Sequence, residues 1–145
     1  MIWVLELPQR VRRDGPIRFF FDESTLGIGQ VMAAARSDCV FPGHARSPIQ
    51  VGTDVVDWIP VASSQEWIVV ARDKKIRSRP AEWAVLAAYL LRMLVLTTVG
   101  NLDVWEQLRV FVARWDRIEE LSTTPAPWVY AVTKNGLREM EYPRL

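Results

Sequence analysis

The stretch "RFFFDEST", Arg18–Thr25, places two carboxylates, Asp22 and Glu23, directly after three consecutive phenylalanines. A short apolar run of this kind is typical of a parallel strand that is buried on both faces. The pattern returns at "WIVVARDKK", where an apolar run leads to Asp73. The sequence therefore predicts two central strands, Ile17–Asp22 and Trp67–Arg72, each followed by acid.

Helix and strand patterns alternate along the rest of the chain, which predicts an α/β fold with a mostly parallel central sheet. Apolar residues at spacings of three and four indicate the faces of two helices that point inward. They are Trp83, Leu86 and Leu90 in one helix, and Val104, Leu108, Phe111, Trp115 and Ile118 in the other. We expect helices at Leu26–Arg36, from Asp54 with Thr53 as its cap, from Pro80 to about Leu91, and at Leu102–Leu121. We expect further strands near Val40 and at Met93–Thr98, Trp128–Thr133 and Leu137–Tyr142.

Length and composition indicate one globular domain. The chain has 145 residues, enough for a core of its own, and its net charge of +1 gives no global attraction to nucleic acid. Because Pro8 and "DGP" break local structure, we expect residues 1–16 to form an extension and residues 17–145 the domain. The lone Cys39 suits a reducing compartment. The most apolar run is interrupted by Arg92, and the N-terminus lacks a signal-peptide pattern, so we expect a cytoplasmic protein without membrane association.

The acids that follow the strands suggest a metal site. Ligands of open parallel sheets bind beyond the carboxyl ends of the strands, an edge that Asp22 and Asp73 would share. Asp54 and Asp57 precede the second central strand and can face the same place. Converging carboxylates repel one another, and a hard cation such as Mg²⁺ or Mn²⁺ relieves that repulsion. The alternative is that each acid only caps a helix or opens a turn.

A basic run surrounds Asp73. Arg72, Lys74, Lys75 and Arg77 lie within six residues of the chain. Basic residues beside a metal-binding acid suit a phosphodiester substrate, although a solvated basic loop is the simpler interpretation.

The segments "RFFFDEST", "DVVDWIP" and "EWIVVARDKKIRSRPAE" together resemble the PIN-like domains, in particular the toxin-type ribonucleases related to VapC. The resemblance implies a three-layer α/β/α domain that binds Mg²⁺ or Mn²⁺ and hydrolyses RNA. It also implies a homodimer, or a hetero-oligomer with a cognate antitoxin of a type II toxin–antitoxin system. By position it assigns catalysis to Asp22, Asp57 and Asp73, metal binding to these with Asp54 and Glu23, and RNA contacts to Arg72, Lys74, Lys75 and Arg77.

One departure from the family pattern keeps other functions open. The glutamate expected on a helix within about forty residues of the first aspartate is missing, because Ser24–Thr53 contains Asp38 as its one acid. Glu23 could replace it, with Asp54 or Asp57 as the further ligand. If no residue replaces that glutamate, the alternative is a catalytically inactive PIN-like module that binds a partner protein. A receiver-like signalling domain phosphorylated on Asp73 is the other alternative, although Asn135 stands where that class carries proline.

Overall fold

The computed structural model of the chain describes residues 15–72 and 80–141. These residues form a six-stranded sheet in the order β2-β1-β3-β4-β5-β6, in which the β5–β6 pair is antiparallel and the other pairs are parallel. The strands are β1 Phe19–Phe21, β2 Cys39–Val40, β3 Ile68–Arg72, β4 Arg92–Leu96, β5 Trp128–Thr133 and β6 Gly136–Met140. The predicted α/β class with a mostly parallel sheet is confirmed.

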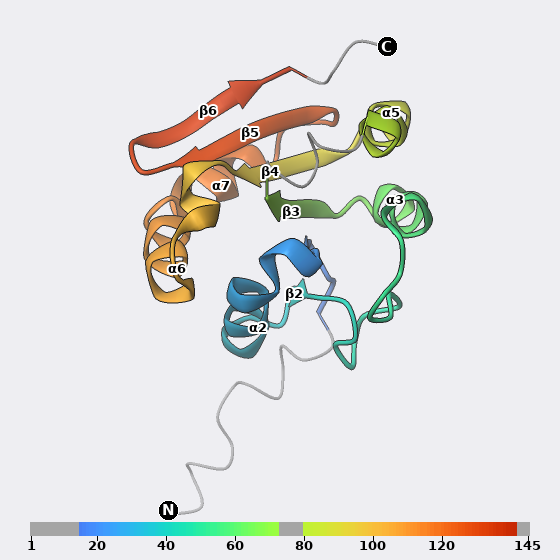
Figure 1. Cartoon of the computed structure of the whole chain (residues 1–145), viewed down its shortest axis with the longest axis horizontal. Coiled ribbons are helices and arrows are strands. Elements are labelled where there is room, and N and C mark those ends of the chain that lie inside the picture. The colour runs from blue at the N-terminus through green and yellow to red at the C-terminus, as the bar shows by residue number, and fades with distance from the viewer. Residues whose placement is uncertain (1–14, 73–79, 142–145) are drawn as a thin grey trace, which may run out of the picture.

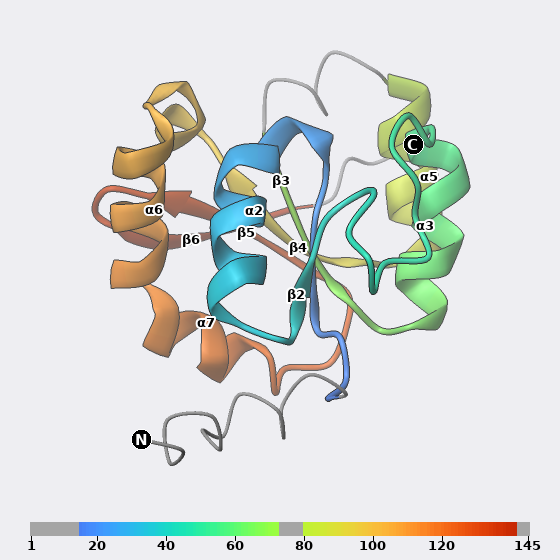
Figure 2. The same cartoon turned by 90° about the horizontal axis from the view of Figure 1, so that it is seen from below.

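Helices cover both faces of this sheet, which gives the predicted three layers (Figures 1 and 2). On one face lie α3 (Val55–Ser64) and α5 (Pro80–Tyr89), which pack against each other. On the other lie α2 (Leu26–Ala35), α6 (Val104–Ala113) and α7 (Trp115–Leu121). Short 3-10 turns, η2 (Glu23–Thr25) and η3 (Thr98–Asn101), follow β1 and β4.

The three phenylalanines of β1 pack into the apolar layers on both faces of the sheet. Phe20 packs on one face against Trp58 and Trp67, with ring centroids 5.1 and 5.5 Å apart. Phe19 and Phe21 point to the opposite face, into the cluster that α2, α6 and α7 cover. All three are fully buried. A strand in the middle of the sheet alternates between two apolar layers, so a continuous apolar run is what this position requires.

Glycine lets α2 approach that strand closely. A Cβ added at Gly29 would lie 2.6 Å from the Cβ of Phe21, closer than real Cβ atoms come. The glycine that lowers the helix propensity of this segment is therefore needed for packing.

The predicted helix Leu102–Leu121 is wrong in one respect, because the chain forms two helices that meet at Arg114. Asp103 caps the first by accepting a hydrogen bond from the backbone N–H of Glu106 at 2.9 Å. The second runs in a different direction (Figure 2). Val104, predicted to point inward, is 43% exposed, although it lies against α2, where a Cβ added at Gly27 would come 2.5 Å from its Cγ2; Phe111 is fully buried as predicted.

Two smaller predictions on the other face are also corrected. Leu90 was expected on the core face of its helix, but α5 ends at Tyr89 and Leu90 turns away with φ 52° and an exposed fraction of 53%. Thr53 does not cap α3: Asp54 holds the cap position, and the Thr53 hydroxyl donates to the carbonyl of Gln50 at 2.7 Å.

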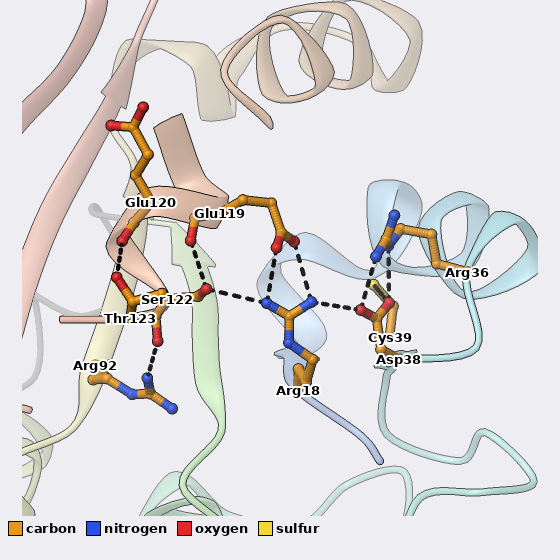
Figure 3. A network of polar contacts seen from close by, with 9 residues as sticks. All are labelled: Arg18, Arg36, Asp38, Cys39, Arg92, Glu119, Glu120, Ser122 and Thr123. Carbon is orange, nitrogen blue, oxygen red and sulfur yellow. Dashed lines mark hydrogen bonds and ion pairs between the residues drawn. The ribbon is translucent and has the colours of Figure 1, made fainter. Parts of the chain in front are cut away.

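A polar network ties the amino ends of the strands to α7 (Figure 3). Arg18, directly before β1, donates to both carboxylate oxygens of Glu119 at 3.1 Å and to Asp38 at 3.0 Å. Arg36 donates to the two oxygens of Asp38 at 2.9 Å. Arg92, which begins β4, donates to the carbonyl of Ser122 at 2.9 Å. The network therefore fixes this edge through charge-assisted bonds.

Burial and charge compete within this network. Burial alone would raise the pKa of Asp38, but the hydrogen bonds from Arg36 and Arg18 outweigh it and hold that pKa below its usual value. Burial raises the pKa of the neighbouring Cys39 thiol, and the Asp38 carboxylate reinforces the shift. The thiol is therefore neutral and packs as a small apolar group.

Within residues 15–72 and 80–141, none of the helices combines the length and the apolar character that crossing a lipid bilayer requires.

Candidate active site at the carboxyl edge of the sheet

The strand order reverses next to β1. From β1 the chain goes to β2 on one side and then crosses to β3 on the other. In open α/β sheets such a switch point leaves a crevice beyond the carboxyl ends of the two strands, which is where ligands bind. The carboxyl ends of β1 and β3 lie at this point, and Asp22 and Arg72 stand there.

Asp22 is held firmly at the end of β1. It is 4% exposed, and its backbone N–H donates to the carbonyl of Val70 in β3 at 3.1 Å. Its Oδ1 accepts from the backbone N–H of Ser24 at 3.0 Å, which makes Asp22 the cap of η2. Thr25 adds a hydroxyl bond to the same Val70 carbonyl at 2.9 Å. The capping role that was the alternative interpretation of this acid is thus present.

Ser24 connects the two strand ends. Its hydroxyl donates to Oδ1 of Asp22 and accepts from the backbone N–H of Arg72, the latter at 3.0 Å. One side chain thereby fixes the acid of β1 relative to the last residue of β3. Ser24 was not predicted as part of the site; the available signal was its place two residues after the aspartate, where a side-chain hydroxyl commonly hydrogen-bonds to the nearby chain.

Arg72 lies against the turn that follows β4. Its Nη2 donates to the side-chain oxygen of Asn101 at 3.1 Å. A Cβ added at Gly100 would come within 3.0 Å of its Nε and 3.2 Å of its Cγ, so the glycine leaves the space in which the guanidinium lies. Among the described residues its side-chain partner is a neutral amide. Arg72 was predicted as a site residue, whereas Gly100 and Asn101 were not.

The other predicted acids that the structure describes are exposed. Glu23 is exposed and accepts from the backbone N–H of Gly52 at 2.6 Å, which ties the loop before α3 to η2. Asp54 and Asp57 are exposed at the start of α3. In the part of the chain that the structure describes, no three acidic, histidine or cysteine side chains gather as a metal cage.

Four predicted site residues lie outside the described residues: Asp73, Lys74, Lys75 and Arg77. The metal site therefore stays a prediction. The described residues place oxygen atoms at the switch point, those of the Asp22 carboxylate and the Ser24 hydroxyl. Oxygen ligands suit Mg²⁺ or Mn²⁺.

Asp38 cannot stand in for the missing family glutamate. It precedes β2, and its carboxylate is bound by Arg18 and Arg36 at the amino edge of the sheet (Figure 3). Because the strands are parallel, that edge is opposite to the one where Asp22 lies.

The fold and this edge define a class: a parallel α/β domain with a buried carboxylate at its switch point. A family profile described as PIN like domain matches residues 17–98, more than half of the chain, so the chain belongs to the family of PIN-like domains. A search of curated proteins gave no match. A search of solved structures gave none either. PIN-like domains are generally nucleases, and this membership favours the nuclease interpretation over a receiver domain.

Proposed function

We propose that the protein is a metal-dependent endoribonuclease of PIN-like type, the toxin of a type II toxin–antitoxin system. The observation that carries the proposal is the buried carboxylate of Asp22 at the switch point of a chain that belongs to a nuclease-type family. The expected partners are an RNA substrate and a cognate antitoxin, in a homodimer or a toxin–antitoxin hetero-oligomer.

The proposed metal site is formed by acidic residues. Asp22 and Asp73, with Asp54 or Asp57 and with Glu23 as a further candidate, would hold Mg²⁺ or Mn²⁺. When bound, such an ion activates water and stabilises charge on the phosphate. Ser24 keeps the Asp22 carboxylate in a fixed orientation.

Arg72 would position the scissile phosphate, since a planar guanidinium bound to a neutral amide can donate to phosphate oxygens. Lys74, Lys75 and Arg77 would contact the RNA backbone on either side. These contacts are independent of base identity, so they position the strand without selecting its sequence.

The test is cleavage of a structured RNA by the purified full chain with Mg²⁺ or Mn²⁺. Cleavage is expected to stop on chelation and to fall to background in Asp22→Asn and Asp73→Asn. The control is Asp116→Asn, which removes an exposed carboxylate in the first turn of α7 and should cleave normally. Thermal melts verify that each variant folds, and cleavage that survives both site substitutions would show that the site lies elsewhere.

A second candidate is a PIN-like module that binds a partner protein without cleaving RNA. The ion pairs of Asp38 with Arg18 and Arg36 at the amino edge favour this candidate. They hold the one acid between Ser24 and Thr53 away from the carboxyl edge, where a metal ligand would be needed. Titration of Mn²⁺ separates the two functions. An active nuclease binds the ion through Asp22 and cleaves, whereas the inactive module neither cleaves nor loses Mn²⁺ affinity in Asp22→Asn.

A further inference from the structure

Helix α6 carries apolar side chains on its outer side as well as toward the core. Phe111 is the residue that it buries completely. On the outside, Trp105 is 66% exposed and Val112 is 50% exposed. Leu108, between them in the sequence, is half-buried and also packs against the core. Spacings of three and four place these side chains in one stripe along the helix. Single exposed apolar residues are ordinary, but a contiguous stripe containing tryptophan marks an interaction surface.

A hollow of about 600 Å³ runs along this helix and reaches the turn between β5 and β6. Both views place that turn beside α6 (Figures 1 and 2). We call this hollow with the apolar stripe the α6 groove. Its lining combines Trp105, Leu108 and Val112 with charged residues, namely Glu106, Arg109, Arg114 and Lys134.

The charges of the α6 groove do not balance. Glu106, the one acid of the lining, is paired with Arg109 at 3.0 Å. Arg114 donates to the backbone carbonyl of Lys134, which leaves its charge uncompensated, and its Nε is buried without a hydrogen-bond partner in the described residues. A buried donor of this kind is rare because it has lost water without gaining an acceptor. A carboxylate from outside the chain would compensate the charge of the Arg114 guanidinium.

We propose that the α6 groove binds an amphipathic segment of a partner protein, with apolar side chains against Trp105 and Val112 and an aspartate or glutamate against Arg114. This is the recognition mode in which a helix lies in an apolar groove. The aliphatic side chains favour a peptide over RNA, because Leu108 and Val112 offer nothing to phosphates or base edges. The proposal does not depend on the proposed nuclease activity.

The experiment is a selection from a displayed library of random 16-residue peptides on the full-length protein. Enriched peptides are expected to combine apolar residues at spacings of three and four with an acid. For the strongest of them, affinity measured by fluorescence anisotropy should fall at least tenfold in Trp105→Ser. Arg117→Gln is the matched control, because this arginine of α7 is exposed and paired with Glu120; it should leave affinity unchanged.

The acidic contact is tested by pairing two changes. Replacing the peptide's acid by glutamine should weaken binding to the wild type but not to Arg114→Gln. If Arg114→Gln fails to fold, the preference for an acid is measured on the wild-type protein alone. Peptides in which the acid is replaced by glutamine or by lysine should then bind more weakly than the selected peptide.

Several results would overturn the proposal. They are an empty selection, peptides without acid, binding that survives Trp105→Ser, and competition for the groove by a 12-nucleotide single-stranded RNA. Sedimentation that shows a dimer dissociated by Trp105→Ser would also overturn it, and would assign the α6 groove to a second copy of the chain.

Discussion

Ser24→Ala removes the hydroxyl that joins the ends of β1 and β3. Two hydrogen bonds disappear together: the one donated to Oδ1 of Asp22 and the one accepted from the backbone N–H of Arg72 at 3.0 Å. The Asp22 carboxylate keeps the bond from the backbone N–H at position 24, so the cap of η2 survives the change. Hence the variant should fold and yet lose the link between the two strands.

The expected loss of stability follows from these two bonds. A net contribution of about 1 kcal/mol is typical of a neutral hydrogen bond, and one to a charged group contributes about 1.5–3 kcal/mol. Arg72 is half-buried, so water replaces part of what its N–H loses. We therefore expect a free energy of unfolding lower by about 2 kcal/mol, and a melting temperature lower by about 4–8 °C for a chain of this size. If the proposed function is right, a less well oriented Asp22 should also lower cleavage by about 10–100-fold.

Thermal and urea denaturation measure the first effect without reference to function. Ser64→Ala is the matched control, because the Ser64 hydroxyl is exposed and donates to a carbonyl of its own helix at 2.9 Å; its cost should stay below about 0.5 kcal/mol. A Ser24→Ala variant that melts within about 1 °C of the wild type would refute the bridging role of this hydroxyl.

Three further predictions concern other parts of the fold. Because the pKa of Asp38 lies below its usual value, this carboxylate stabilises the fold above the unfolded-state pKa of about 4, and the effect is lost as the pH falls through the lower folded-state pKa. Urea melts of Asp38→Asn should therefore differ most from the wild type at neutral pH and converge with it below about pH 4; a constant difference would contradict this. Gly29→Ala should destabilise by about 1–3 kcal/mol in thermal melts despite its better helix propensity, because its Cβ would meet Phe21, and a stabilised variant would disprove the close approach. If the proposed function is right, Gly100→Ala should displace Arg72 and raise the KM for RNA several-fold with kcat nearly unchanged, so an unaltered KM in steady-state cleavage would argue against its positioning role.

Much of the sheet could be predicted from the sequence because its strands are buried on both faces. The strand predicted at Trp128–Thr133 is confirmed with those bounds, and the central strands differ from the prediction only at their ends. The break at Arg114 could not be predicted. Apolar spacings of three and four continue through it from Phe111 to Ile118, so local periodicity gives no sign that the axis turns there.

The candidate site was predictable in part for a similar reason. Asp22 follows an apolar run, and its place at the carboxyl edge follows from the parallel sheet. The contacts that orient the site join residues distant in sequence: Ser24 meets Arg72 across 48 positions, and Arg72 meets Asn101 across 29. No local pattern encodes such pairs, since they depend on strand order and on the turn after β4.

The two lateral borders of the sheet restrict how copies of the chain can associate. At one border β2 has two residues, too few to template another strand, and at the other β6 exposes the charged pair Arg138 and Glu139. Short and charged borders disfavour the addition of a strand from another molecule. Self-association of this chain should therefore use its helices and loops, and concentrated preparations should resist growth into cross-β fibrils.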